Sequence, residues 1–263
     1  MNVYYKKVLY IKRIEYLFAC FFYLFVYFLN ISESKFMSTL HAIALPDGAR
    51  KDNPSDVDMQ FRHTRSLAAK QRGDTRSAII WCGTELLTER GFQITGIDEI
   101  LSIVGVPKGS FYYYFKSKRE FGVAVVDNYV QFYAQKMALL FDNPERTPLQ
   151  RLQDFVDDGK LGMTKYDFKR GCLIGNMGQE LAALNDEFRE RLEQVMQTWE
   201  ARVTTLFALA RNTGEIAQSH DPESLSQFFW IGWEGAILRS KLTRSVAPLD
   251  RFAQIFFSKV LVR

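Results

Sequence analysis

Cysteine is scarce in this chain of 263 residues, and its few cysteines form no recognisable pattern. Cys20, Cys82 and Cys172 lie far apart, with no CxxC pair and no spacing typical of a zinc site. An odd number of widely separated cysteines excludes a dense disulfide framework and indicates a reducing, intracellular compartment. Cys82 falls within a helical apolar stripe, so we expect it to be a core residue.

The sequence also lacks the motifs of common enzyme classes. It has no P-loop, no dinucleotide-binding fingerprint and no nucleophile elbow. Its three histidines, His41, His63 and His220, fall in predicted linkers and loops, so a histidine acid–base pair is not expected. We therefore predict a protein that is not an enzyme and that uses no metal ion or cofactor.

Net charge is low, at +4, but the positive charge is unevenly spread. From Arg62 to Glu120 there are ten Lys or Arg residues and six Asp or Glu residues, an excess of four that equals the net charge of the whole chain. A local excess of this kind is typical of a surface that binds phosphate groups. A solvated surface without such a partner is the alternative.

Residues 1–36 contain no glycine or proline and differ in composition from the rest of the chain. Phe, Tyr, Ile, Asn and Lys make up 21 of these residues, a bias typical of AT-rich codons that ends at Met37. We interpret the segment as translated upstream sequence, with Met37 or Met59 as the start. Residues 16–32 are uncharged and follow four basic residues, so a membrane span or another leader is the alternative.

Residues 73–122 carry the patterns of a compact three-helix unit. Apolar periodicity predicts helices at about 75–90 and 95–104, and Gly91 and Gly105 follow them as stop signals. Two short helices joined through a glycine turn are typical of a helix-turn-helix.

A third short helix is predicted at about 107–114. Thr95 and Asp98 resemble a capping box at the start of the second helix, and Ser117 and Glu120 resemble another ahead of a fourth, longer helix.

The third helix divides into two faces at about 100° per residue. Phe111 and Phe115 fall on one side and are predicted to anchor the helix on the first two. The residues of the opposite side suit contact with nucleic acid, and they are Lys108, Gly109, Ser110, Tyr112 and Tyr113. Phenol and ammonium groups reach phosphate oxygens, a serine hydroxyl reaches a phosphate or a base edge, and glycine permits close approach. Packing of the tyrosines on another part of the chain is the alternative.

Residues 74–122, which include GFQITGIDEILSIVGVPKGSFYYYFKSKREFG, resemble the DNA-binding domain of TetR-type repressors. The resemblance implies an all-α fold with a three-helix head and a helical body at 123–263 that binds ligands and forms a homodimer. It implies a cytoplasmic regulator whose partners are double-stranded operator DNA and a small-molecule effector. Carried over by position, the DNA-contacting residues would be Thr95, Lys108, Gly109, Ser110, Tyr112, Tyr113, Tyr114 and Lys118.

Residues 37–72 show no sustained apolar period and are predicted to be a disordered linker or arm. Arg62, Arg65, Lys70 and Arg72 precede the first helix and are placed to reach a DNA minor groove. A mobile arm without that contact is the alternative.

The body is predicted to form a series of helices, at about 118–140, 148–164, 172–183, 186–212, 222–243 and 248–261. We expect the helices at 186–212 and 222–243 to form a four-helix interface in the homodimer. The apolar stripe of the first of these, from Phe188 to Phe207, is predicted to contact the second subunit. Packing of that stripe inside one subunit is the alternative.

Two body segments resemble a narrower group. FKRGCLIGNMGQELAAL (168–184) and FWIGWEGAILRSKL (229–242) are similar to acrylate-responsive members of the family and, more distantly, to electrophile-sensing ones. This resemblance implies an effector that is acrylate-like or electrophilic.

Four body residues are candidates for effector sensing. Cys172 follows two basic residues at a predicted helix start, where a lowered thiol pKa would favour a reactive sensor. A buried structural cysteine is the alternative. Trp230, Trp233 and Glu234 are predicted to line a ligand pocket, with a role in the core or interface as the alternative.

The sequence therefore predicts a DNA-binding repressor that a small molecule releases from its operator. The competing hypothesis is a membrane-anchored DNA-binding sensor, which requires residues 16–32 to be a span. A membrane is not an expected partner.

Overall fold

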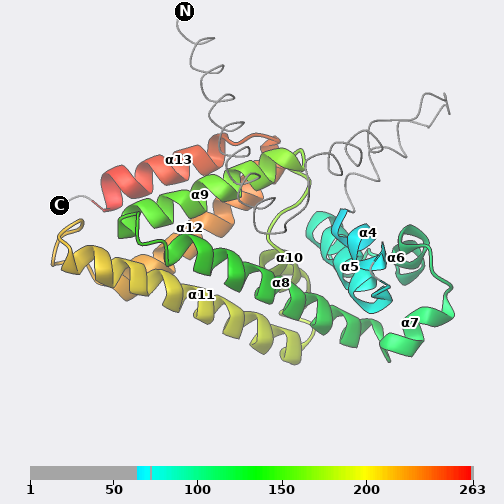
Figure 1. Cartoon of the computed structure of the whole chain (residues 1–263). Coiled ribbons are helices and arrows are strands. Elements are labelled where there is room, and N and C mark those ends of the chain that lie inside the picture. Colours follow the sequence, from blue (N-terminus) through cyan, green and yellow to red (C-terminus); the bar gives the residue numbers. More distant parts are fainter. Residues whose placement is uncertain (1–63, 72, 262–263) are drawn as a thin grey trace, which may run out of the picture. The chain divides into compact units, whose positions relative to one another are not determined.

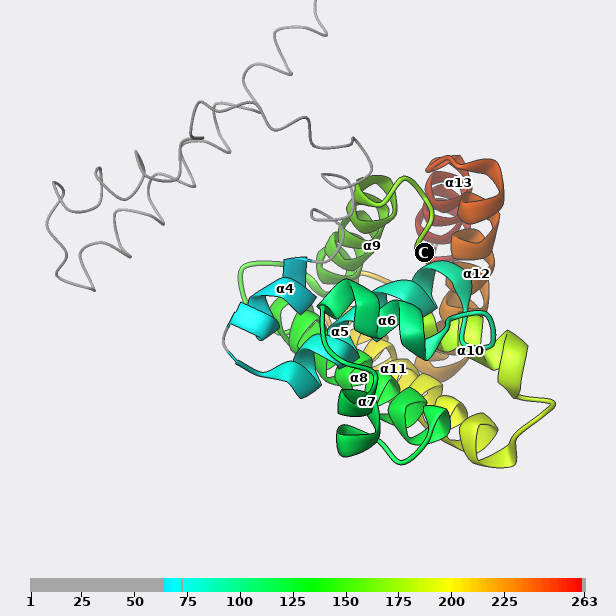
Figure 2. The ribbon, with the colours of Figure 1, turned by 90° about the vertical axis from the view of Figure 1, so that its right-hand side faces the viewer.

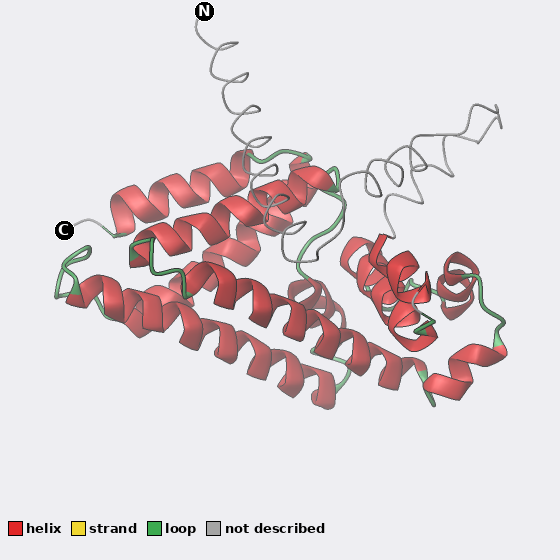
Figure 3. Ribbon diagram, in the orientation of Figure 1, coloured by secondary structure: helices red, strands yellow, loops and turns green. Residues whose placement is uncertain are grey.

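The computed structural model describes residues 64–71 and 73–261, and every regular element within them is a helix (Figures 1 and 3). In chain order these are α4 (Thr64–Gln71), α5 (Thr75–Arg90), α6 (Ile97–Val104), α7 (Gly109–Tyr114), α8 (Lys118–Phe141), α9 (Pro148–Lys165), α10 (Leu173–Leu181), α11 (Asp186–Asn212), α12 (Pro222–Thr243), α13 (Ala247–Ile255) and a π-helical turn, η1 (Phe256–Val260). The predicted all-α fold is confirmed.

Helices α5, α6 and α7 form the predicted head and lie at one end of the long helix α8 (Figures 1 and 2). The Asp74 carboxylate accepts the Ser77 N–H at 2.9 Å and caps the start of α5. Gly91 and Gly105 end α5 and α6 with φ values of 95° and 67°, which glycine adopts without steric cost. The first two helices therefore end at the stop signals expected from the sequence.

Helix α4 corrects the prediction of a disordered arm for residues 64–71, the part of the 37–72 range that the structure describes. It packs on α5, because Ser66 and Ala69 are small enough to be buried there, and the Ser66 hydroxyl donates to the Ala78 carbonyl at 2.9 Å. The Arg65 guanidinium lies 4.2 Å from the Phe132 ring centroid. Arg65 is thus engaged with the body in this structure, and not extended as a free arm.

Several predictions about the N-terminal part fall outside the described residues. These are the leader at 1–36, the possible span at 16–32, the first part of the arm, and the contacts of Arg62 and Arg72. Within residues 64–71 and 73–261, no helix has both the length and the apolar character needed to cross a membrane.

The long helices of the body begin at side-chain caps. Thr147 and Gln150 form a capping box at the start of α9, with Pro148 as its first residue. Asn185 and Asp221 cap α11 and α12 by accepting a main-chain N–H in the first turn. These signals are local, and the predicted bounds of α8, α9, α11 and α12 agree with the structure to within one residue.

The apolar stripe of α11 packs inside the subunit, which corrects the prediction that it contacts a second copy. Phe188, Trp199 and Phe207 are all at most 3% exposed, and α11 lies against α8, α9, α10 and α12. A long helix in a helical bundle needs its apolar face for its own core. The exposed apolar side chains of this helix pair are instead concentrated on α12, at Phe228, Ile231, Leu238 and Leu242.

Candidate DNA-binding surface and effector cavity

Helix α7 presents the two faces expected from its sequence. Phe111 is fully buried and Phe115 is 1% exposed, and both rings pack on Phe121 at 5.3 to 5.6 Å between centroids. On the other side, Tyr112 and Tyr113 are 61% and 83% exposed. Both tyrosines predicted to contact DNA are therefore open to solvent.

The N-terminal end of α7 is also open. Lys108 is exposed, and its ammonium donates to the Asp98 carboxylate at 2.9 Å. A methyl group added at Gly109 would meet no atom within 4 Å, so the space outside the backbone there is free. Ser110 and Tyr114 are half-buried at the edges of this face.

Thr95 is buried, whereas the resemblance predicted that it contacts phosphate. Its side chain is 1% exposed, and its hydroxyl donates to the Gly91 carbonyl at 2.7 Å. Gly96, and not Thr95, is the N-cap of α6, so the predicted capping box with Asp98 does not form. The hydroxyl therefore stabilises the α5–α6 turn from inside.

Lys118, the first residue of α8, is held against the head. Its ammonium donates to the Gln93 carbonyl at 3.0 Å and lies 4.9 Å from the Phe92 ring centroid. Partial burial lowers the pKa of Lys118. The Ser117 hydroxyl accepts the Glu120 N–H at 3.1 Å, which is one half of the predicted capping box. The Glu120 carboxylate accepts the Lys116 N–H at 2.9 Å, and not that of Ser117, so the other half does not form.

The body encloses a cavity of about 360 Å³ between α5, α8, α9, α11, α12 and the loop before α10. All four residues predicted to sense an effector line it, namely Cys172, Trp230, Trp233 and Glu234. Tyr129, Tyr133, Phe155 and Trp199 also line it and were not predicted. Each is an apolar position in a helical stripe, and such positions usually belong to the core, so the sequence contains no signal that separates them from it.

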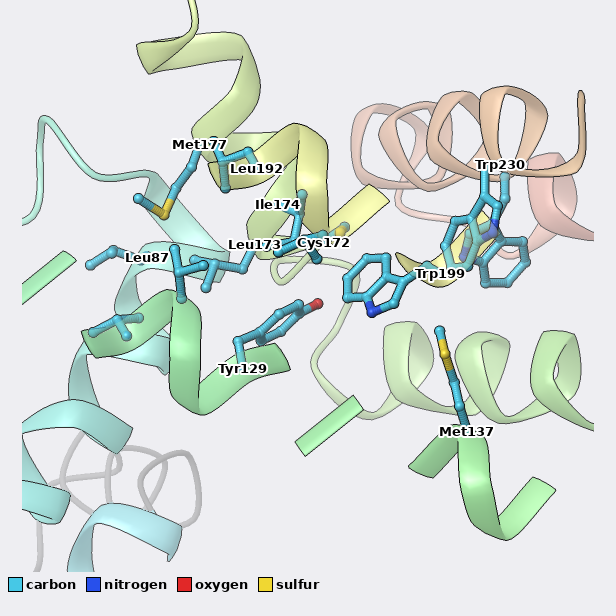
Figure 4. Close-up of a cluster of buried hydrophobic side chains, with 14 of the residues drawn as sticks. Leu87, Tyr129, Met137, Cys172, Leu173, Ile174, Met177, Leu192, Trp199 and Trp230 are labelled. Carbon is cyan, nitrogen blue, oxygen red and sulfur yellow. The ribbon is translucent and has the colours of Figure 1, made fainter. Parts of the chain in front are cut away.

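Aromatic rings form most of the cavity wall. Trp199 and Trp230 stack at 5.2 Å between ring centroids, and Tyr133 packs on Trp199 at 5.6 Å. Phe155 lies 5.9 Å from Trp230. Figure 4 shows Tyr129, Cys172 and Trp199 meeting, with Trp230 beyond Trp199. Such a wall suits a small, partly apolar ligand.

Glu234 supplies a carboxyl group to this aromatic surface. The residue as a whole is half-buried, but its Oε1 is shielded from solvent and has no hydrogen-bond partner among the described residues. Oε2 lies against Gly175, where an added Cβ would be only 2.3 Å away. Burial raises the pKa of Glu234 to about 7, and a hydrogen bond from the Cys172 thiol partly offsets this.

The pKa of Cys172 contradicts the expectation of a lowered value. Burial raises it well above the usual range of a thiol, and the nearby Glu234 carboxylate raises it further. The main-chain N–H groups of Gly175 and Ile174 act in the opposite direction, as expected at a helix start, but they do not outweigh burial. Cys172 is 7% exposed and is a protonated thiol at rest.

Sequence comparisons identify the family to which the head and the body belong. Residues 79–125 match the profile of bacterial regulatory proteins of the tetR family, and residues 148–256 match the tetracyclin repressor-like C-terminal domain. The chain is 42% identical over 205 residues to the transcriptional regulator AcuR of Cereibacter sphaeroides, covering 78% of this chain and 94% of that protein. The chain belongs to the TetR family of transcriptional regulators.

Other relatives and solved structures agree with this TetR-family assignment. The HTH-type transcriptional repressor DhaR of Mycobacterium sp. is 30% identical over 190 residues, which cover 72% of this chain and 94% of that protein. A crystal structure of a regulatory protein TetR from Rhodobacter sphaeroides superposes with a TM-score of 0.67 at 45% identity, covering 68% of this chain and 95% of that chain. The reduced form of E. coli NemR gives a TM-score of 0.63 at 28% identity, covering 72% and 97%.

Like other members of its family, this TetR-family regulator binds operator DNA as a dimer and responds to a small molecule. It is a DNA-binding regulator and not an enzyme.

Helix α10 of the regulator starts at the cavity and ends against the head. Cys172 immediately precedes it and lines the cavity. In its first turn, the Asn176 amide donates to a main-chain carbonyl in the last turns of α5 at 2.9 Å. Near its end, the Glu180 carboxylate accepts the N–H groups of Phe92 and Gln93, each at 2.9 Å. One short helix therefore connects the cavity wall to the α5–α6 turn.

Further contacts reinforce this connection. The Gly171 N–H donates to the Thr88 carbonyl at 3.0 Å, and the Lys241 ammonium of α12 reaches the Glu89 carbonyl at 3.4 Å. At Gly91, an added Cβ would lie 1.6 Å from Glu180 Oε1, so only glycine permits this approach. A displacement of α10 must therefore move the end of α5.

Proposed function

We propose that this regulator is a cytoplasmic repressor that an acrylate-like or electrophilic small molecule releases from its operator. In this proposal residues 73–122 bind DNA, and residues 123–263 bind the effector and form the dimer. The connection of the effector cavity to the head through α10 is the observation that carries it. The resemblance of residues 168–184 and 229–242 to acrylate-responsive repressors supports the effector class.

DNA contact is assigned to the exposed face of α7 and its neighbours. This surface consists of Lys108, Gly109, Ser110, Tyr112, Tyr113 and Tyr114, with Lys118 at its edge. Its hydroxyl and ammonium groups are suited to phosphate oxygens and base edges in a major groove. Thr95 is left out because its side chain is buried.

Release requires only that the effector prefer a body conformation in which the two heads of the dimer no longer fit successive major grooves. An effector in the cavity contacts the residues at the start of α10, and any shift there is transmitted to the α5–α6 turn by Glu180 and Asn176. The ratio of the effector's affinities for the two conformations sets the size of the response.

The test is operator release in solution. A duplex selected by the purified protein from a random library is labelled, and its fluorescence anisotropy is followed as acrylate is added. Acrylate is expected to lower the anisotropy to that of free DNA, while chloride at equal ionic strength has no such effect. Unchanged anisotropy at saturating acrylate would exclude acrylate as an effector.

Covalent sensing at Cys172 is a second candidate, because the thiol lines the cavity and is hydrogen-bonded to Glu234, whose carboxylate can accept the thiol proton. The Glu234 carboxylate takes the thiol proton, the sulfur adds to the β-carbon of an acrylate-type double bond, and the proton passes to the α-carbon. The S–H and C=C π bonds are replaced by S–C and C–H bonds, so no oxidant is needed. Intact mass spectrometry after incubation with acrylate tests this route, and an unmodified Cys172 in protein that has left the operator rules it out.

A further inference from the structure

Two residues that line the effector cavity carry buried polar atoms without a partner among the described residues. Among the described residues, buried side-chain polar atoms without a hydrogen-bond partner occur at four places, and two of these, Trp230 Nε1 and Glu234 Oε1, belong to residues that line the cavity. Buried polar atoms in native proteins nearly always have partners, since leaving one unpaired costs about 1–3 kcal/mol. A pair of them in one cavity indicates that a ligand supplies the missing bonds.

The two residues that carry these atoms lie on one face of α12. Trp230 and Glu234 are four residues apart on α12, so their side chains lie on the same face of that helix. The stacking of Trp230 on Trp199 fixes the indole ring. Contact with Gly175 fixes the Glu234 carboxyl through its other oxygen, Oε2. The pair therefore contributes a fixed N–H donor and a fixed carboxyl group to the residues that line the cavity.

The other charged groups around the cavity already have partners of their own. On α8 and α9, the Lys136 ammonium lies 2.5 Å from the Asp158 carboxylate. Arg170, before α10, lies 3.9 Å from Glu85 on α5.

The cations on the remaining walls lie over aromatic rings. Arg65 on α4 lies over the Phe132 ring, and Lys165 at the end of α9 lies over the Tyr166 ring.

Tyr166 lines the cavity beneath Lys165 and Arg170, and the buried uncharged titratable groups on the wall are Tyr129, Tyr133 and Cys172. Burial raises the pKa of each of them, so all three remain protonated at neutral pH. Glu234 is therefore the cavity group whose charge changes near neutral pH.

We propose that the Trp230 indole N–H and Glu234 Oε1 together bind the carboxyl group of the effector, which is a small organic acid. The inference rests on the proposed function and names the ligand class of its cavity. An indole N–H only donates, so it requires an acceptor such as a carboxylate oxygen. The second carboxylate oxygen then faces Glu234, and two carboxyl groups in contact share one proton because both cannot be ionised together.

The shared proton gives the site a pH signature. A ligand that is a carboxylate throughout this range binds only the protonated form of Glu234. With a pKa of about 7, the protonated fraction falls about tenfold between pH 6 and pH 8. Affinity is therefore expected to fall about tenfold over that interval and to level off below pH 6.

The experiment is calorimetric titration of the full chain with acrylate, propionate and acrylamide at pH 6 and pH 8. Propionate has the carboxyl group but no double bond to react with Cys172, whereas acrylamide has the double bond but no carboxyl group. Both acids are expected to bind roughly tenfold or more tightly than acrylamide at pH 6. Equal affinity for acrylamide and acrylate, or affinities that do not change with pH, would overturn the proposal.

Two variants locate the carboxyl group. Trp230→Phe keeps the ring and removes the donor, so it is expected to weaken acrylate binding roughly tenfold or more. Glu234→Gln provides an amide N–H donor that does not titrate, so the pH dependence of acrylate affinity is expected to disappear. Glu223→Gln, an exposed position on the same helix, is the matched control and should behave as wild type. Circular dichroism establishes that each variant is folded.

Lys136→Gln tests whether the carboxyl group binds instead at the cationic wall that α8 contributes to the cavity. If this variant loses acrylate affinity while Trp230→Phe and Glu234→Gln keep it with wild-type pH dependence, the carboxyl group binds at the cationic wall and the proposal is wrong. Failure of the proposed function looks different. In that case neither acid binds the wild-type protein and neither releases the operator, whereas failure of the carboxyl site alone leaves operator release by acrylate intact.

Discussion

The Tyr113 hydroxyl provides the sharpest test of the DNA-binding surface. Tyr113 is 83% exposed, and its hydroxyl forms no hydrogen bond with the described residues, so the fold does not depend on it. Tyr113→Phe removes this one oxygen atom and leaves the ring. A change at so exposed a position is expected to alter the free energy of unfolding by less than about 0.5 kcal/mol.

The effect on DNA affinity is much larger if the phenol contacts phosphate. A hydrogen bond to a charged group contributes about 1.5–3 kcal/mol, and the dimer loses one such bond in each subunit. The lower figure taken twice gives about 3 kcal/mol, or roughly a 100-fold weaker operator complex. Because a neutral phenol releases no counterion, the slope of log affinity against log salt should stay at its wild-type value.

Fluorescence anisotropy with a labelled operator duplex, titrated at several salt concentrations, measures both quantities. Phe111→Ala is the contrasting variant, since emptying a fully buried aromatic site costs about 3–5 kcal/mol of stability and should unfold the head. If Tyr113→Phe binds the operator as tightly as wild type, its phenol does not contact phosphate and the assignment of this face is wrong.

Glu180→Gln weakens the charge-assisted hydrogen bonds to the α5–α6 turn, so operator affinity should persist while the acrylate concentration needed for release rises several-fold, measured by anisotropy. Ile231→Asp places a charge on the exposed apolar face of α12 and should shift the dimer toward monomer in sedimentation velocity. Leu139→Asp, at an exposed position on α8, is the control and should leave the dimer intact. A dimer that survives Ile231→Asp would show that this face of α12 is not the dimer interface. The Glu234 pKa is raised from 4.5 to about 7 on folding, so its contribution to stability is complete below pH 4.5 and is lost as the pH rises through 7. Wild type should thus lose about 3 kcal/mol more than Glu234→Gln between pH 4.5 and pH 8 in urea unfolding, and parallel curves would contradict the burial of this carboxyl.

The features of the fold that depend on local signals could be predicted from the sequence. The predicted bounds of α11 and α12 match the structure, in which Asn185 and Asp221 cap the two starts, and the two faces of α7 follow from the positions of its aromatic residues. Such signals depend on neighbours within a few residues, which a sequence shows directly.

The features that depend on contacts between distant parts of the chain could not be predicted from the sequence. The stripe of α11 shows that one face is apolar, but not whether the same subunit or a second one covers it. The raised pKa of Cys172 arises from burial and from Glu234, which lies on another helix. Trp230 and Trp233 were predicted to line the cavity, but Tyr129 and Trp199 were missed because they come from helices far apart in the sequence.

The side chains of helix α10 form hydrogen bonds with main-chain groups of the head. The Asn176 amide donates to main-chain carbonyls of Leu87 and Thr88, and the Glu180 carboxylate accepts main-chain N–H groups of the α5–α6 turn. None of these bonds depends on which side chains the head carries at those positions, apart from the glycine at Gly91. The residues of α7 are thus free to diverge toward new operator sequences while the same effector continues to govern release. Operator recognition and effector response are therefore separable in this architecture. A head exchanged between relatives can come under the control of the effector that the body already binds.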